Sequence, residues 1–180
     1  MPIDFVGSAR GSLGLEWEFA LVDLDTRQLS SRAPELLAAV DARQDGPVRG
    51  EYLATMVELV TGVHPDVPSA VAELTRHLRT VQAAAAGLGL GVYSAGTHPL
   101  TRGEDVAITP SPHYDVVRRR NGWWGRRMLI CGTHVHVGVP ERDLALPLVH
   151  GLAQLSPLVM ALASSSPFFE GEDTDFASQR

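Results

Sequence analysis

The segment at residues 131–138 (CGTHVHVG) restricts the fold of this chain more than any other part of its sequence. Its β-branched residues favour a strand, in which alternate side chains share one face. His134 and His136 would then point the same way, about 6 to 7 Å apart, with two valines on the opposite face. Two imidazoles arranged in this way indicate a strand that holds a metal ion, a phosphate group, or both.

Composition and charge narrow the class of protein. The chain has 180 residues, of which 44% are hydrophobic and 20% charged. This length and hydrophobic content are sufficient for one domain with its own hydrophobic core. Its net charge of −6 argues against nucleic acid or an anionic membrane as a general partner, because both need a positive field. A single cysteine, Cys131, cannot form an intramolecular disulfide, so we expect a cytoplasmic protein. Prolines and polar residues interrupt the apolar stretch 144–163, which we interpret as a buried helix broken near Pro157 and not as a membrane span.

The order of predicted elements is that of an α+β fold. Strands are predicted over residues 12–24, 92–95 and 128–139, and helices over 33–42, 69–87, 113–120 and from Glu141 onward. Residues 48–63 mix strand formers with helix formers and allow either structure. We expect one domain over residues 1–180, with a largely antiparallel sheet and helices on one face.

Two pairs of acidic residues accompany the histidine strand. Glu16 and Glu18 would share one face of a strand whose other face carries three large apolar side chains. Carboxylates this close repel each other unless a cation lies beside them, although a solvated face with ordinary charges is an equally good reading. Glu51 and Glu58 would share a helical face but not the face of an unbroken strand, so a bulge or loop would be needed to bring both inward. Taken alone, this second pair fits an exposed amphipathic element somewhat better.

These acids, together with an imidazole, form a ligand set for a hard divalent cation. Carboxylate-rich sites with one histidine suit Mg²⁺ or Mn²⁺ better than structural zinc. Magnesium commonly accompanies a nucleotide, yet the sequence has neither a Gly-rich lysine loop nor any lysine. Nucleotide phosphates would therefore have to be held by metal and arginine. A metal-dependent hydrolase, which would need no ATP but commonly a further set of histidines, is one alternative.

Five segments in order resemble the type 2 glutamate-cysteine ligase family. They are residues 14–19, 51–63, 96–99, 131–138 and 164–180. Members of this family are ATP-dependent carboxylate-amine ligases within the glutamine synthetase-like superfamily. The resemblance covers nearly the whole chain and implies a curved antiparallel sheet whose concave side holds two or three divalent ions and ATP.

The resemblance also implies roles for individual residues. The family's acidic metal-binding positions match Glu16, Glu18, Glu51 and Glu58, and its metal or nucleotide histidine matches His134. His136 would touch phosphate or substrate, which makes it a catalytic candidate together with Glu58, and Arg180 joins His134 as a candidate nucleotide-binding residue. The implied reaction transfers the γ-phosphoryl group of ATP to a carboxylate, that of glutamate in the characterised ligases. An amine, cysteine in those enzymes, then attacks the acyl phosphate.

Family members continue well beyond the part that this chain resembles. We therefore expect residues 1–180 to be the N-terminal part of a carboxylate-amine ligase catalytic domain. The remainder would add strands, acids and arginines, so the isolated chain is expected to have an incomplete active site. A non-catalytic half-domain that binds nucleotide or metal is the second alternative. An open sheet edge would also favour a homo-oligomer.

Overall fold

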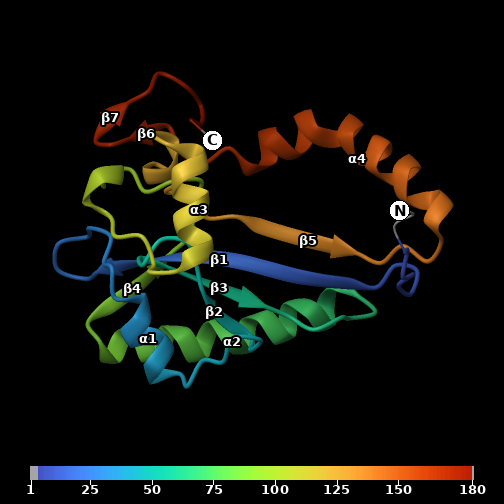
Figure 1. The fold of residues 1–180 in the computed structure, drawn as a ribbon, viewed down its shortest axis with the longest axis horizontal. Coiled ribbons are helices and arrows are strands. Elements are labelled where there is room, and N and C mark those ends of the chain that lie inside the picture. The colour runs from blue at the N-terminus through green and yellow to red at the C-terminus, as the bar shows by residue number, and fades with distance from the viewer. Residues whose placement is uncertain (1–3, 180) are drawn as a thin grey trace.

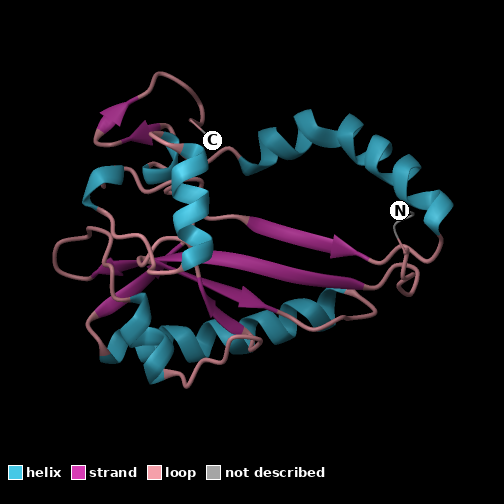
Figure 2. Ribbon diagram, viewed as in Figure 1, coloured by secondary structure: helices cyan, strands magenta, loops and turns pink. Residues whose placement is uncertain are grey.

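The computed structural model describes residues 4–179 and is built around one long strand (Figures 1 and 2). β1 (Leu13–Asp23) pairs along one edge with β3 (Met56–Val60), which in turn pairs with β2 (Val48–Gly50). Two strands share the other edge of β1: β5 (Thr133–Val137) lies beside its first half and β4 (Leu90–Tyr93) beside its second. These pairings are antiparallel, as predicted.

The main hydrophobic core lies between one face of this sheet and two helices. α1 (Ala33–Ala39) and α2 (Val67–Gly87) confirm the two predicted helices, with ends that shift by at most three residues. Asp66 caps α2 by accepting the N–H of Ser69 at 2.8 Å. The largest buried side chains of this core are those of Phe19, Leu21, Leu36, Val48, Val57, Leu59, Leu74, Val81 and Leu90. One stripe of α2 and the alternate residues of β1 meet here, as an amphipathic helix on a half-buried strand requires.

A smaller core covers only the far end of the opposite sheet face. It consists of Ala20, Tyr52, Leu53, Met56 and Leu129. α3 (Pro112–Asn121) packs on this cluster through Tyr114, and the Tyr52 hydroxyl donates to the carbonyl of Gly125 at 2.7 Å. Since this cluster begins at Ala20, the first half of the same face stays open. That open half carries Glu16 and Glu18.

Residues 48–63, for which the sequence allows either structure, form β2 and β3 joined by a turn that begins at Glu51. β5 is shorter than predicted and is flanked by Gly132 and Gly138. The remaining short elements are η1 (Gly103–Asp105), η2 (Trp124–Arg126) and the hairpin of β6 (Phe168–Phe169) and β7 (Glu172–Asp173).

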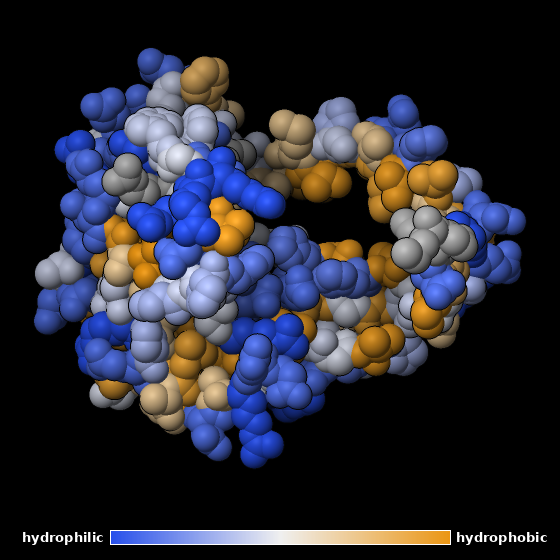
Figure 3. Space-filling model, in the orientation of Figure 1, coloured by the Kyte–Doolittle hydropathy of each residue, from blue (hydrophilic) through white to orange (hydrophobic). Residues whose placement is uncertain are grey.

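The helix α4 (Arg142–Ala163) differs from its prediction in two respects. It runs through Pro147 and Pro157 without a break, curving as it does so (Figure 1), and none of its apolar window is buried. Figure 3 shows α4 as an arch over an open gap. The prediction of a buried helix broken near Pro157 is therefore wrong, because the described residues supply no layer against which α4 could pack. By length and composition alone, α4 is also able to cross a membrane.

Candidate metal centre

The register of three strands gathers the predicted acids and histidines on one sheet face. Glu16 lies opposite His134, and Glu18 lies opposite Glu58. Directly opposed residues of an antiparallel pair share a face, so β1, β3 and β5 present these side chains to the side away from the main core. Glu51 reaches the group from the turn after β2. That turn is the loop required for two acids seven positions apart to point inward together.

The ligand atoms form two clusters that share one carboxylate. Ligand atoms of Glu16, Glu58 and His134 lie within 4.8 Å of one another, and so do those of Glu18, Glu51 and Glu58. Two ligands about 2.1 Å from a magnesium ion lie up to about 4.2 Å apart across it, so small side-chain movements would close each cluster around an ion. The structure therefore brings together all five predicted metal-binding residues, whereas Arg180 lies outside the described residues.

Both histidines of β5 contact the same carboxylate. His134 Nδ1 lies 2.9 Å from Glu16 Oε2, and His136 Nε2 lies 3.1 Å from the same oxygen. The hydrogen bond from His134, followed by that from His136, lowers the pKa of Glu16. The bond to Glu16 in turn raises the pKa of His134. His136 belongs to neither cluster and lies at their margin. Its role as a contact for phosphate or substrate stays a prediction.

Burial and neighbouring negative charges oppose ionisation of Glu51 and Glu58. Desolvation raises the pKa of Glu58 to about 7, and the charges of the three neighbouring acids add to the shift. Burial also raises the pKa of Glu51, although the N–H of Tyr52 donates to this carboxylate at 2.9 Å. Arg49, opposite Glu58 in β2, opposes the shift of Glu58 as its weakest influence. The face is therefore deficient in positive charge, which a divalent cation would supply.

Gly132 positions Glu18, a role that the sequence analysis did not predict. Its N–H donates to Glu18 Oε2 at 2.7 Å. A Cβ at residue 132 would lie 3.1 Å from His134 Nε2 and 3.3 Å from the Glu18 carboxylate. The missing side chain thus leaves room between a ligand of one cluster and a ligand of the other. A glycine two residues before His134 is visible in the sequence, but only the pairing of β5 with β1 shows what it faces.

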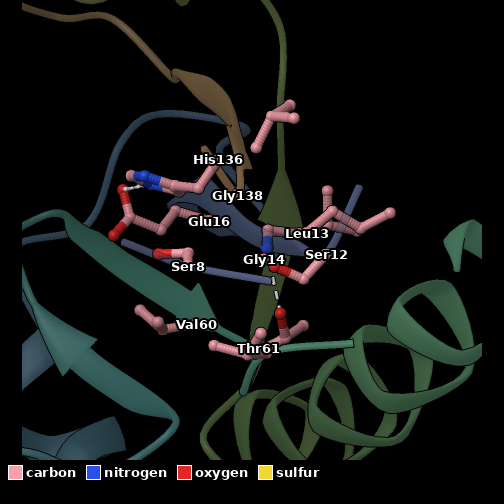
Figure 4. Close-up of a pocket in the computed structure, with 12 residues that line it drawn as sticks. Ser8, Ser12, Leu13, Gly14, Glu16, Val60, Thr61, His136 and Gly138 are labelled. Carbon is pink, nitrogen blue, oxygen red and sulfur yellow. Dashed lines mark hydrogen bonds and ion pairs between the residues drawn. The ribbon is translucent and has the colours of Figure 1, made fainter. Parts of the chain in front are cut away.

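A pocket of about 410 Å³ begins beside Glu16 and His136 (Figure 4). Its other lining residues are Ser8, Ser12, Leu13, Gly14, Leu15, Val60, Thr61, Val63, Val137 and Gly138. The Thr61 hydroxyl accepts the N–H of Leu15 at 2.9 Å, and the Ser12 hydroxyl donates to the carbonyl of Ala9 at 2.7 Å. Apolar walls with a few hydroxyls, next to the acidic clusters, suit a neutral ring or sugar better than a charged group.

Two other residues that could carry chemistry have structural roles. The Cys131 thiol is largely buried, and desolvation raises its pKa to about 11, which argues against a nucleophile. His98 is buried in a loop, where Nε2 lies 3.1 Å from the carbonyl oxygen of Arg27 and Nδ1 accepts the N–H of Thr101 at 3.1 Å. Within residues 4–179, His134 is the sole histidine in either cluster. The further histidine set expected of a metal-dependent hydrolase is thus not found in this part of the chain.

Comparison with known proteins gives a consistent result. The family model described as "Glutamate-cysteine ligase family 2 (GCS2)" matches residues 12–180. The protein named "Putative glutamate–cysteine ligase 2-1" from Mycolicibacterium smegmatis is 43% identical over 178 residues, which are 99% of this chain and 47% of that protein. The protein named "Putative glutamate–cysteine ligase 2-2" from Nocardia farcinica is 46% identical over 182 residues, covering 99% of this chain and 48% of that one. The chain thus spans about half the length of the curated relatives it matches.

A solved structure shares the fold. It is the crystal structure of glutamate–cysteine ligase from Francisella tularensis in complex with AMP, with a TM-score of 0.58 at 14% identity. The match covers 83% of this chain and 31% of that one. At this level of identity the likeness extends to the fold, and it confirms the predicted α+β architecture.

Proposed function

The chain belongs to glutamate-cysteine ligase family 2, and from this premise we propose that it forms the metal-binding wall of an ATP-dependent carboxylate-amine ligase. The observation that carries the proposal is the pair of ligand clusters joined by Glu58. In this proposal residues 1–180 are the N-terminal part of the catalytic domain. The substrates of the proposed ligase are ATP, an amino-acid carboxylate such as that of glutamate, and an amine such as that of cysteine. The lone cysteine and the use of ATP fit a reaction in the cytoplasm.

The donor atoms fit two hard divalent ions, Mg²⁺ or Mn²⁺. Glu16, Glu58 and His134 would hold one ion, while Glu18, Glu51 and Glu58 would hold the other. When bound, such ions neutralise charge on the ATP phosphates and on the carboxylate that attacks them. Glu58 keeps the two clusters together as a shared ligand. The backbone N–H of Gly132 keeps Glu18 in its orientation through a hydrogen bond of 2.7 Å to Oε2.

The pocket of Figure 4 is suited to the nucleoside part of ATP. Its hydroxyls can bind a ribose and its apolar walls a base, and its mouth at Glu16 would direct the triphosphate toward the clusters. His136 is placed at that mouth, where it can donate a hydrogen bond to a phosphate oxygen. The Francisella tularensis ligase was solved in complex with AMP, which supports a nucleotide in this fold.

The proposed reaction depends mainly on positioning and on charge. The substrate carboxylate attacks the γ-phosphorus of ATP in line with the departing ADP, and the amine then displaces phosphate from the acyl phosphate. Such a site needs cationic donors around the γ-phosphate, and Arg49 is the one arginine among the causes that act on the pKa of Glu58 in the described residues. We therefore propose that the 180-residue chain binds metal and nucleotide, and that turnover requires the remainder of a full-length family member.

Metal binding tests the site itself. Calorimetric titration of the 180-residue chain with Mn²⁺ is expected to give two ions per chain, and Glu58→Gln is expected to weaken both by at least about a hundredfold. Glu172→Gln, in the hairpin of β6 and β7, is a matched control that should leave both ions bound. Unchanged binding by Glu58→Gln would refute the shared-ligand site.

Turnover tests the reaction. In a longer protein that includes the unmatched half of the family, ADP release should require both glutamate and an amine, and Glu16→Gln should abolish it. If the metal-loaded protein instead catalysed a hydrolysis that needs no ATP, the ligase proposal would be refuted and a metal-dependent hydrolase would be favoured. Turnover by the longer protein, with binding but no turnover by the 180-residue chain, would identify this chain as a binding half-domain.

A further inference from the structure

Three titratable side chains meet outside the metal centre, where the chain passes from β3 to α2. Glu73, near the start of α2, lies between His64 and His77. Its Oε2 contacts His64 Nε2, and its Oε1 lies 3.3 Å from His77 Nε2. Between 18% and 21% of each side chain is exposed, so water competes weakly for these contacts. The proposed reaction gives none of these three residues a role.

The same carboxylate also holds the backbone after β3. Glu73 Oε2 accepts the N–H of Gly62 at 3.1 Å. The hydrogen bond from His64, with smaller contributions from Gly62 and His77, lowers the pKa of Glu73 despite its partial burial. The carboxylate is therefore ionised at neutral pH, the state in which both of its oxygens accept hydrogen bonds.

Residues 61–64, which we call the pocket wall, lie between β1 and α2. Thr61 and Val63 line the pocket of Figure 4. Backbone hydrogen bonds join the pocket wall to β1: the N–H of Leu13 donates to the carbonyl of His64 at 2.8 Å, and the N–H of His64 donates to the carbonyl of Leu13 at 2.7 Å. The pocket wall is thus held by β1 on one side and by the carboxylate of α2 on the other.

The pocket wall approaches β1 closely at Gly14. A Cβ on Gly14 would lie 3.4 Å from the carbonyl oxygen of Gly62 and 3.9 Å from the Thr61 hydroxyl, and Figure 4 shows Thr61 beside Gly14. The Thr61 hydroxyl accepts the N–H of Leu15 and donates to the carbonyl of Gly62 at 2.9 Å. A movement of Gly62 would therefore change both the spacing of the pocket and the direction of a hydroxyl that lines it.

We propose that Glu73 is a positioning residue for the pocket of Figure 4, which holds Gly62 and thereby keeps the pocket wall at the spacing that the nucleoside of ATP requires. His64 and His77 keep the carboxylate in place from two sides. Glu73 is not among the residues that line the pocket, so it acts through Gly62 and not by contact with the nucleotide. This inference rests on the proposed function, because it takes the pocket as the nucleoside site.

Calorimetric titration of the 180-residue chain with Mn²⁺-ATP tests the inference. Glu73→Gln keeps one oxygen acceptor but loses the negative charge, and it should weaken Mn²⁺-ATP binding about tenfold, the order expected for losing a hydrogen bond to a charged group. Its affinity for Mn²⁺ alone should not change, because Glu73 belongs to neither ligand cluster. Glu35→Gln, which removes an ion pair with Arg32 on α1, is the matched control and should change neither affinity.

The amide proton of Gly62 gives a readout that a merely structural role would not move. In NMR spectra of the ¹⁵N-labelled chain, its resonance should move upfield as Glu73 takes up a proton, with a midpoint below the usual pKa of 4.5. Glu73→Gln should lack this step. Asp66 also lies near His64, but its carboxylate accepts the N–H of Ser69 at 2.8 Å. A step that persists in Glu73→Gln would assign the titration to Asp66 and overturn the inference.

The remaining outcomes separate this inference from the proposed function. Equal Mn²⁺-ATP affinities for the parent and Glu73→Gln would overturn the positioning role alone. A parent that binds Mn²⁺ but no ATP would overturn the nucleoside pocket, and the positioning role with it. Equal losses of Mn²⁺ and Mn²⁺-ATP affinity in Glu73→Gln would indicate a general loss of structure and would also overturn the positioning role. So would the absence of a Gly62 step below pH 4.5 in the parent.

Discussion

The two faces of β1 differ in what stabilises them. On one face, Phe19 and Leu21 are buried against the helices that cover the sheet. On the other, Glu16 and Glu18 lie beside Glu58, whose pKa burial and neighbouring charges raise to about 7. The first face is stabilised by the chain's own side chains, whereas the second gathers carboxylates whose charge, in our proposal, a divalent cation balances. Because successive residues point to opposite sides, a single strand both anchors the core and presents the ligands. If the two faces are divided in this way, changes to the buried face should lower the free energy of unfolding most, and changes beside the carboxylates should lower it least.

Removing a core side chain should have the largest effect. Leu21 is fully buried, so Leu21→Ala should lower the free energy of unfolding by about 2 to 5 kcal/mol. Val135→Ala, on the exposed β5, should change it by less than about 0.5 kcal/mol. Urea denaturation followed by circular dichroism measures both. Similar losses for the two variants would contradict the assignment of the core to one face.

Divalent ions should stabilise the chain through the other face. An ion at a hundred times its dissociation constant adds about 2.7 kcal/mol to the free energy of unfolding when it binds only the folded state. Thermal unfolding with Mn²⁺ and with EDTA measures the shift. Glu58→Gln should remove most of it, and Leu21→Ala should retain it despite its lower starting stability. A shift that survives in Glu58→Gln would place the ions elsewhere.

Without divalent ions, Glu58 should make the protein less stable as the pH rises. Between its usual pKa of 4.5 and its raised value of about 7, folded Glu58 holds a proton that the unfolded chain has lost. The unfolded state therefore binds fewer protons, and the free energy of unfolding falls by at most about 1.4 kcal/mol per pH unit. Solvent screening of this partly exposed group reduces that slope. In EDTA, the free energy of unfolding should fall more steeply from about pH 4.5 to 8 for the parent than for Glu58→Gln. Parallel curves for the two proteins would refute the role of Glu58.

Gly132→Ala should have the smallest effect on stability while still disturbing the site. Alanine keeps the N–H that holds Glu18, and its Cβ forces Glu18 or His134 to move by a few tenths of an ångström. We expect Mn²⁺ affinity to fall about tenfold, equivalent to about 1.4 kcal/mol, with a change in unfolding free energy below about 1 kcal/mol. Gly87→Ala, where a Cβ meets nothing within 4 Å, is the matched control and should leave affinity unchanged. Equal affinities for parent and Gly132→Ala would contradict the tight fit.

Local periodicity predicted most of the elements and part of the site. The alternation around Glu16 and Glu18 correctly placed both carboxylates opposite the core, because side-chain direction in a strand depends only on position. The convergence of Glu51 and Glu58 could not be derived in this way, since it depends on a turn whose position residues 48–63 do not reveal. The fit around Gly132 also depends on contact between residues more than a hundred positions apart.

α4 shows a different limit of sequence reasoning. Its composition predicts burial, and a helix so rich in leucine and valine would be buried wherever a second layer is present. Burial is a property of two surfaces, however, and residues 4–179 contain only one of them. The apolar pattern predicts a covering layer, but it does not show which segment supplies that layer.

Because β5 and β4 share one edge of β1, that edge is completed in two steps as the nascent chain folds. The second half of β1 finds its neighbour in β4, whereas the first half must wait for β5, in which His134 lies 118 positions after Glu16. Until β5 leaves the ribosome, the first half of β1 emerges with one edge unpaired. Contacts that close such long loops form late, and unpaired edges attract other chains. The ligand-bearing half of β1 is thus the last part of the sheet to be completed and the first place where nascent chains would aggregate.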